Sequence, residues 1–272
     1  MQRFSAACVW LVVLLLSSSS SLSCDSEAAD VDIYPTANVL PDNLLRFYVY
    51  FPRQMSGQVG ASDLMLLDAD GEPVTNALLA TTYELWSPDR RRLTVLLDPG
   101  RVKTGLYAND TLGRPLINGR RYTIQVPGDL SDSAGCLLGT TTTHSFTAGP
   151  TDKATPAPST WQLKVPRAGS KDALQVDLGS PHDHLSMAYR IRVIDHNGAL
   201  VAGRISLSDN EHVWQFMPRD DWSHSSYRIS VDPRLEDLAG NRPGVRFDRD
   251  INVPEQKWDR EIVFLPGSDA NE

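Results

Sequence analysis

The sequence predicts an all-β fold of two tandem β-sandwiches joined by a proline-rich linker. The first observation is an internal repeat. Residues 122–136 and 227–241 share Tyr, Ile, Val, Leu, Asp, Ala and Gly at a constant offset of 105 residues. In each copy Tyr, Ile and Val fall on every second residue, which is the spacing of a half-buried strand. A repeat of this length fits two sandwich-sized domains better than a solenoid of short units.

Composition and charge agree with an ordinary globular protein. The chain has 272 residues, of which 41% are apolar and 22% charged, so there is material for two cores. The formal net charge of −8 disfavours nucleic acid as a partner, because such proteins need a basic surface. Arg90–Arg92 is the one dense basic run and is interpreted as a solvated hairpin end.

The amino terminus has the pattern of a secretory signal peptide over residues 1–23. Arg3 supplies the positive charge, an apolar run covers Ala6–Leu16, and small residues continue to Ser23. The apolar run is too short to span a bilayer. The protein is therefore expected to be exported.

Cys24 leaves two interpretations open. Leu22-Ser23-Cys24 resembles the end of a bacterial lipobox, in which the cysteine is acylated and becomes the mature first residue, although Ser21 stands where that family prefers leucine. This resemblance implies lipidation at Cys24 and a lipoprotein anchored in a membrane of the bacterial cell envelope. The alternative is ordinary cleavage after Ser23, which gives a secreted or periplasmic soluble protein. In a eukaryotic secreted protein, Asn109 would be a glycosylation acceptor.

Cysteine usage predicts domains that are held together by their cores and not by disulfides. Cys8 leaves with the signal peptide, so the mature chain retains only Cys24 and Cys136. Cys136 lies at a turn with no His or Lys beside it, and we interpret it as an unreactive structural thiol.

The first domain is expected over residues 33–149, after a small and acidic tether at 24–32. Leu45–Phe51 alternates apolar and polar side chains and predicts a strand with one apolar face. Apolar residues on both sides of Asp68–Gly71 predict a tight hairpin whose central residues have positive φ.

Residues 150–160 contain three prolines and no large apolar side chain, which predicts an extended, semi-rigid linker. The second domain is expected over 161–265, with a hairpin at Asp195–Gly198 and a last strand near Ile262, before a disordered tail at 266–272. No helix of more than two turns is expected. In the repeated turn, Gly240 is expected at positive φ with Asp237 bonding the turn amides.

The first domain carries an insertion of 14 residues, near 101–114, that the second domain lacks. A long loop on one copy of a repeated scaffold is a common place for function. Its cationic, aromatic and amide side chains predict a possible partner surface, formed by Arg101, Lys103, Tyr107 and Asn109. The alternative is a loop that folds back, so that Leu106 and Tyr107 cover an open sheet edge.

Two motifs resemble the bacterial immunoglobulin-like (Ig-like) domains of the S-layer (SbsA) type. They are the strand Leu45–Phe51 leading to Pro52 and Met55, and the closing Tyr-x-Ile-x-Val strand followed by Asp237-Leu-Ala-Gly-Asn241. Asp132-Ser-Ala-Gly-Cys136 differs from the second motif's Asp-x-Ala-Gly-Asn by one substitution. The resemblance covers both domains and implies Ig-like sandwiches that serve as spacers or surface modules. It implies no chemistry.

The sequence lacks several common catalytic and metal-binding motifs. It has no Gly-x-Ser-x-Gly elbow, no phosphate-binding glycine loop and no His-Glu-x-x-His, so we expect neither an enzyme nor a cofactor. No metal site is predicted. His182 and His184 are weak candidates, because an extended segment would place both on one side, but exposed loop histidines are the simpler interpretation. Asp68-Ala-Asp70 is interpreted as a hairpin turn and not as a calcium loop.

Four tryptophans are candidates for a carbohydrate platform: Trp86, Trp214, Trp222 and Trp258. Trp214 alternates with Phe216 and is assigned to the core. Trp86 and Trp222 lie at turns and could be exposed, although packing against the sandwich is the commoner outcome.

The sequence therefore predicts a non-enzymatic, exported and lipid-anchored protein of the cell envelope with a structural or interaction role. Its partner would be an envelope protein or a glycan, and the lipid would supply the membrane contact. The alternative is a glycan- or metal-binding surface module, and an enzyme is the third possibility.

Overall fold

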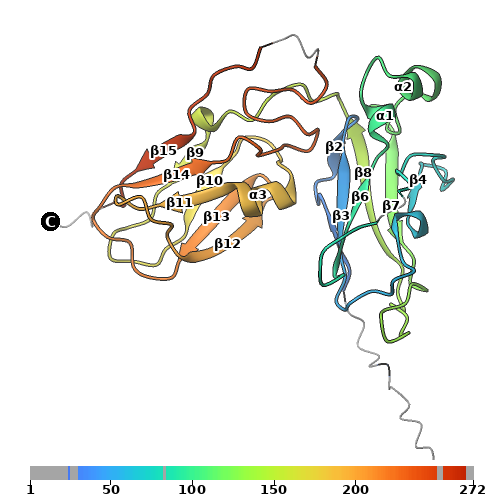
Figure 1. Cartoon of the computed structure of the whole chain (residues 1–272), viewed down its shortest axis with the longest axis horizontal. Helices are drawn as coiled ribbons and strands as arrows, with labels where there is room; N and C mark the ends of the chain where they lie inside the picture. Colours follow the sequence, from blue (N-terminus) through green and yellow to red (C-terminus); the bar gives the residue numbers. More distant parts are fainter. Residues whose placement is uncertain (1–23, 25–29, 82–83, 250–253, 268–272) are drawn as a thin grey trace, which may run out of the picture.

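The computed structural model describes Cys24 and residues 30–81, 84–249 and 254–267, so the predicted signal peptide and most of the tether and tail lie outside the described part. These residues form two tandem Ig-like β-sandwiches, which lie side by side with their strands running in different directions (Figure 1). Because apolar residues alternate along most strands, each pair of sheets encloses its own apolar core.

The first sandwich consists of two four-stranded sheets with the orders β1-β3-β6-β5 and β2-β8-β7-β4. All pairings are antiparallel except β2 with β8, which is parallel. The strands are β1 (Asp32–Tyr34), β2 (Val39–Pro41), β3 (Arg46–Tyr50), β4 (Met65–Leu67), β5 (Leu85–Trp86), β6 (Arg92–Leu96), β7 (Arg121–Val126) and β8 (Thr142–Gly149).

The second sandwich consists of a four-stranded sheet, β12-β13-β10-β9, and a three-stranded sheet, β11-β14-β15. Its strands are all antiparallel, and the last of them includes the strand predicted near Ile262. They are β9 (Gln162–Lys164), β10 (Leu174–Asp177), β11 (Ile191–Ile194), β12 (Gly203–Ser208), β13 (Val213–Pro218), β14 (Tyr227–Val231) and β15 (Glu261–Phe264).

The repeated stretch forms equivalent strands, β7 and β14. Its Tyr, Ile and Val side chains are all buried, as their alternation predicts. The Tyr122 hydroxyl accepts a hydrogen bond from the Ile117 amide at 3.0 Å, and the Tyr227 hydroxyl accepts one from the Ser223 amide at 3.0 Å. A tyrosine that bonds backbone a few residues upstream is a hallmark of immunoglobulin-type sandwiches.

The two predicted hairpin turns are present and share one construction. The Asp68 carboxylate accepts hydrogen bonds from two turn amides, and the Asp195 carboxylate does the same in the second domain. Within these two turns only the glycines, Gly71 and Gly198, have positive φ, at 84° and 85°. The expectation of positive φ at both central residues is therefore wrong, because an aspartate bonding the amides allows the residue before glycine to stay at negative φ.

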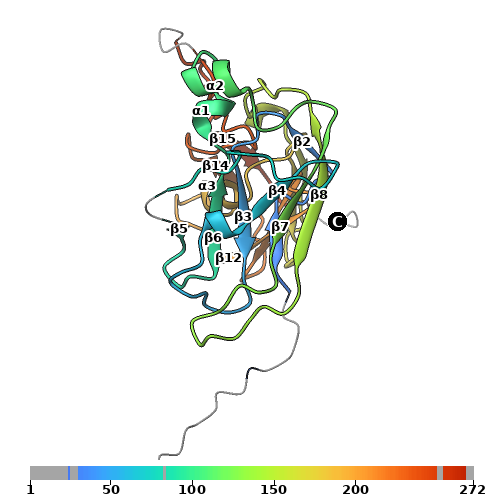
Figure 2. The same cartoon turned by 90° about the vertical axis from the view of Figure 1, so that its right-hand side faces the viewer.

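Helices are short, as expected. They are α1 (Pro99–Val102), α2 (Tyr107–Leu112) and α3 (His184–Arg190), with 3-10 turns at Ala61–Asp63 and Pro158–Thr160. Helices α1 and α2 form the insertion of the first domain and lie at one end of its sandwich, whereas α3 faces the first sandwich from the second (Figures 1 and 2).

The linker does not hold the domains apart. Asn43 of the first domain exchanges two hydrogen bonds with the backbone of Asp152, at 2.8 and 2.9 Å, and both Pro156 and Pro158 are buried. Residues that precede this segment in the sequence also contact residues that follow it, across the boundary between the two sandwiches. The idea of an extended spacer is therefore corrected, because the chain uses this segment to bring the domains into contact.

Strand β3 is covered on both faces. The predicted apolar face is confirmed, because Leu45, Phe47, Val49 and Phe51 all lie in the first core. Phe47 and Val49 enter the first core, while the outward-facing Tyr48 is only 3% exposed because the second domain lies over it. The basic run is also less solvated than expected. Arg90 bonds the Met55 carbonyl at 3.0 Å and stacks on Trp86, which leaves Arg91 as the exposed member.

Candidate functional site

The seam between the two sandwiches contains the largest concentration of buried polar groups among the described residues. It is formed by the outer face of β3 and the segment before it on the first domain. From the second domain come α3, the β12–β13 hairpin tip and the loop 234–249. Figure 1 shows α3 on the side of the second sandwich that faces β3 of the first.

The second copy of the repeated turn inserts into this seam. Leu238 packs within the core of the first domain, and its carbonyl accepts a hydrogen bond from the Leu45 amide at 3.1 Å. Gly240 has a φ of 76°, and the Asp237 carboxylate accepts the amides of Ala239 and Asn241. The predicted turn is thus present, but it also joins the domains, which the sequence did not indicate.

Burial has a large effect on the Asp237 carboxyl. Its side chain is 3% exposed, and burial raises its pKa to about 8 although three N–H groups of Ala239 and Asn241 stabilise the charged form. No arginine or lysine bonds this carboxylate within the described residues.

Next to this turn, a charged network crosses the seam. The Tyr48 hydroxyl donates to the Asp183 carboxylate at 2.8 Å, and Arg46 pairs with both Asp183 and Glu236. Asp183 also caps α3 by accepting the Ser186 amide at 2.8 Å. Burial raises the pKa of Asp183, with Arg46 and the Ser186 amide acting in the opposite direction, and burial beside Asp183 raises the pKa of Tyr48.

The opposite side of the seam is built on a left-handed hairpin tip. Asp209, Asn210 and Glu211 have φ of 51°, 52° and 62°, a region that residues with side chains seldom adopt in succession. The Glu211 carboxylate accepts the Thr36 amide at 3.0 Å and its hydroxyl at 3.1 Å, so the hairpin is held against the first domain. His184 stacks on Tyr34 beside it, with ring centroids 3.7 Å apart.

A cleft of about 410 Å³ opens along the charged network, and we name it the arginine cleft. Its lining includes four arginines against two carboxylates, Asp183 and Glu236, together with the aromatic ring of Tyr189. The arginines are Arg46, Arg190, Arg234 and Arg242. Asp232, just outside, pairs with Arg190 and Arg234, so the cleft and its border still carry one arginine more than carboxylates.

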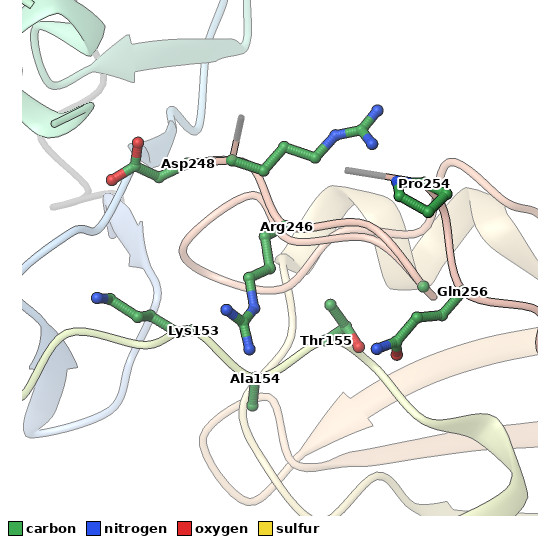
Figure 3. Close-up of a pocket in the computed structure, with 9 residues that line it drawn as sticks. Lys153, Ala154, Thr155, Arg246, Asp248, Pro254 and Gln256 are labelled. Carbon is green, nitrogen blue, oxygen red and sulfur yellow. The ribbon is translucent and has the colours of Figure 1, made fainter. Parts of the chain in front are cut away.

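A second cleft, of about 420 Å³, lies between the linker and the loop 244–249, and we name it the linker cleft. Arg246 extends from the loop toward Ala154 and Thr155, while Lys153 and Asp248 point toward the first sandwich (Figure 3). Asp248 is engaged there, because its carboxylate accepts the Thr104 hydroxyl at 2.7 Å. Arg249 pairs with Glu255 at 3.4 Å.

The predicted partner surface of the insertion is not assembled as expected. Arg101 is buried and donates hydrogen bonds to the carbonyls of Thr75, Asn76 and Gly113, each at 2.9 Å, so it fixes the insertion to the sandwich. Asn109 donates to the Arg101 carbonyl at 2.5 Å. These two residues are therefore corrected to structural roles, because Arg101 satisfies backbone carbonyls of the insertion and of the sandwich, and Asn109 satisfies one within the insertion.

The other two residues of that surface behave differently from each other. Lys103 lies over the Phe247 ring of the second domain, with its Nζ atom 5.5 Å from the ring centroid. Tyr107 is 84% exposed and Leu106 is 42% exposed, so neither covers a sheet edge. The edge-cover alternative is therefore also wrong for these two side chains.

The histidine candidates do not form a pair. His182 is buried against Trp161, its Nδ1 atom lies 2.9 Å from the Ser180 carbonyl, and burial lowers its pKa to about 4. His184 instead stacks on Tyr34. Neither is an exposed loop residue, which corrects that interpretation. No group of three or more potential metal ligands occurs in the part of the chain that the structure describes.

The tryptophans are used for packing. Trp214 and Trp222 are 0% and 1% exposed, and Trp222 donates to the Asp172 carbonyl at 2.8 Å. Trp86 donates to the Val59 carbonyl at 3.1 Å and packs on Phe51. Packing against the sandwich is thus confirmed for both: Trp222 is buried and Trp86 is half-buried, and each bonds a backbone carbonyl of its own domain.

Cys24 forms a disulfide with Cys136, with the two Cα atoms 5.6 Å apart. One sulfur atom cannot carry both a disulfide and the thioether of a lipid, so lipidation at Cys24 is at odds with this structure. The interpretation of Cys136 as a thiol is corrected in the same way. The bond ties residue 24 to the first copy of the repeated turn, across 112 residues of sequence.

No helix in the described ranges is long and apolar enough to cross a membrane.

Comparisons with known proteins assign no family. No protein-family model matches the chain, and no curated protein matches it. Among solved structures, the Ig1-2 module of the Drosophila receptor protein tyrosine phosphatase DLAR is 14% identical, with a TM-score of 0.25 over 76% of this chain and 92% of that one. Escherichia coli alpha-2-macroglobulin (MG0-NIE-MG1) is 8% identical, with a TM-score of 0.26 over 87% and 71%.

Titin domains Z1Z2, solved with telethonin, are 12% identical, with a TM-score of 0.21 over 75% of this chain and 89% of that one. With TM-scores this low, the description of the fold depends on the strand pairing and tyrosine bonds given above.

Sequence reasoning missed the residues that form the seam and the arginine cleft. Arg46 and Tyr48 occupy the polar positions of an alternating strand, which normally face water. Two tyrosines and an arginine on one outer face were the available signal, because aromatic residues and arginine are enriched at interfaces.

Proposed function

We propose that this chain is an exported, non-enzymatic protein of the cell envelope, related to the S-layer type of Ig-like domain. In this proposal its two domains act as one interaction body. The docked seam is the observation that carries the proposal. The Leu238 side chain lies in the first core, and Tyr48, Arg46 and Thr36 bond acidic side chains of the second domain. A spacer of independent domains has no need of such contacts.

Export is supported by two independent features. The first 23 residues have the pattern of a signal peptide, and disulfides such as Cys24–Cys136 form and persist in oxidising compartments. A secreted or periplasmic protein retains this disulfide, whereas an anchor on Cys24 would prevent it.

A non-enzymatic role is supported by what the perturbed groups do. Asp183 and Tyr48 bond each other across the seam, and Asp237 bonds its own turn. Each of these groups therefore has a structural task that accounts for its burial.

Small-angle scattering tests whether the domains form one body. The mature chain should give the scattering profile of the docked arrangement, and Leu238→Asp, which places a charge in the first core, should give an expanded one. Ala134→Asp serves as the control, because it introduces the same charge in the exposed first turn. A wild-type profile that fits only freely moving domains would contradict the proposal.

Export is tested separately by the intact mass of the mature protein made with its own signal. We expect cleavage before Cys24 and a mass lower by two hydrogens than that of the reduced chain. An added acyl mass would contradict the disulfide and restore the anchor.

A second candidate function, a surface module for a glycan, is favoured by the arginine cleft. This cleft combines arginines with an exposed aromatic ring. None of the four tryptophans that the sequence offers as a carbohydrate platform lines it.

A further inference from the structure

We infer that the arginine cleft binds an acidic saccharide, that is, a sugar carrying carboxylate groups. The inference rests on the proposed function, because Arg46 and Tyr48 come from the first domain and the other lining residues come from the second. The cleft exists only when the domains are docked. Its volume of about 410 Å³ lies in the range of small-ligand sites.

The charge of the cleft selects an anion. Arg46 is balanced by Glu236 and Asp183, and Arg190 and Arg234 share Asp232. The Arg242 guanidinium has no side-chain partner within the described residues, although it lines the same cleft. In a chain with a net charge of −8, an unbalanced arginine inside a cleft beside three others is a site for a carboxylate.

Arg242 stands on a fixed loop. Its amide donates to the Val245 carbonyl at 2.7 Å, and the Val245 amide donates back to its carbonyl at 2.8 Å. Asn241 before it and Pro243 after it are both buried. The backbone therefore loses little freedom when the guanidinium engages a ligand, which favours binding.

The remaining lining groups fit a sugar better than a simple anion. Tyr189 is 58% exposed, so its ring is available to pack on the apolar face of a pyranose. The Glu236 carboxylate adds acceptors for sugar hydroxyls. The linker cleft has a similar volume but no aromatic ring among its described lining residues.

Calorimetry on the mature, disulfide-bonded chain tests the inference, with trigalacturonate as the probe. Three further ligands are titrated in parallel: the fully methyl-esterified trisaccharide, inorganic phosphate and a hexa-aspartate peptide. We expect binding of trigalacturonate alone, weakened by added salt because the contact is ionic. Removal of Arg242 by Arg242→Ala should weaken it by about tenfold to a hundredfold, the usual effect of losing a charged hydrogen-bond partner.

Matched variants separate a specific site from general charge. Arg219→Ala removes an exposed arginine that does not line the cleft, so its affinity should equal that of the wild type. Arg242→Lys keeps the charge but loses the two-pronged geometry, and should fall between Arg242→Ala and the wild type. Tyr189→Ala should weaken binding of the saccharide and leave the salt dependence of binding nearly unchanged, because it removes no charge.

Several results would overturn the inference. They are no binding of trigalacturonate at millimolar concentration, equal loss in Arg219→Ala and Arg242→Ala, or phosphate or the acidic peptide binding as tightly as the sugar. Scattering keeps the two proposals apart. A docked protein that binds no saccharide refutes only this inference, whereas an undocked wild type refutes the proposed function first.

Discussion

The two copies of the Asp-x-Ala-Gly turn have the same backbone design and opposite surroundings. Asp132 and Asp237 each accept the amides two and four residues further on, and Gly135 and Gly240 have φ of 84° and 76°. The first turn lies at the solvent end of its sandwich, where Arg53 and the disulfide hold it. The second is enclosed between the domains. One local motif thus carries the disulfide to Cys24 in the first copy and forms part of the contact between the domains in the second.

The electrostatic difference follows from these surroundings. Burial tends to raise the pKa of Asp132, but the Cys136 amide at 2.9 Å and the Arg53 guanidinium at 2.6 Å outweigh it, so that the pKa is lowered. No cation among the described residues bonds Asp237, and its pKa is raised to about 8. The two pKa shifts differ in sign because the effect of burial dominates at Asp237, whereas backbone amides and the Arg53 guanidinium outweigh it at Asp132.

Valine in place of the two glycines should separate the turns most clearly. Both substitutions force a β-branched residue to positive φ, which costs about 1–3 kcal/mol. A Cβ atom at Gly240 would also collide with Leu45 Cδ1, whereas one at Gly135 has open space. Gly240→Val should therefore lower the free energy of unfolding by about 2–6 kcal/mol, and Gly135→Val by about 1–3 kcal/mol. Urea unfolding measures both. Equal losses would show that the seam tolerates displacement of Leu45.

Converting the first turn into the second tests the disulfide. Cys136→Asn reproduces the sequence Asp-x-Ala-Gly-Asn of the second turn and removes the bond to Cys24. We expect it to lower the free energy of unfolding by about 2–5 kcal/mol, because the unfolded chain is no longer cross-linked. Reduction of the wild type should give the same loss, and the variant should not respond to reductant. A wild type insensitive to reductant would contradict a stabilising bond.

The pH dependence of stability should have opposite signs at the two aspartates. The folded pKa of Asp237 is above its unfolded value, so its contribution is complete below about pH 4 and is lost as the pH rises through about 8. Stability should fall by on the order of 1 kcal/mol per pH unit over this range, and Asp237→Asn should flatten the curve. Urea midpoints from pH 5 to 9 measure it.

Asp132 provides the matched control. Its folded pKa is lowered, so its contribution is present above the ordinary pKa of aspartate and is lost as the pH falls through the lower folded value. Asp132→Asn should therefore change only the acidic side of the profile, below about pH 4. If Asp132→Asn removed the slope at neutral pH, the assignment of that slope to Asp237 would be wrong.

Periodicity was sufficient to predict the strands, the repeated turn and its glycine, because these depend on residues close together in the sequence. The seam depends on residues far apart. Tyr48 and Asp183 meet across 135 residues, and an alternating strand looks the same whether its polar face meets water or a second domain. Arg101 was misjudged for a related reason, since a buried arginine that satisfies five carbonyls reads in sequence like an exposed one.

The position of Leu238 has a consequence for the order in which the chain can mature. This residue completes the core of the first domain but belongs to the second, so it leaves the ribosome after all strands of the first sandwich. Until then Leu45 lacks its cover, and the apolar end of the first domain faces water. Contacts of such high sequence separation form late and slow folding. The emerging first domain therefore exposes an apolar surface for as long as synthesis of the second takes, and exposed apolar surface of that kind is prone to aggregation.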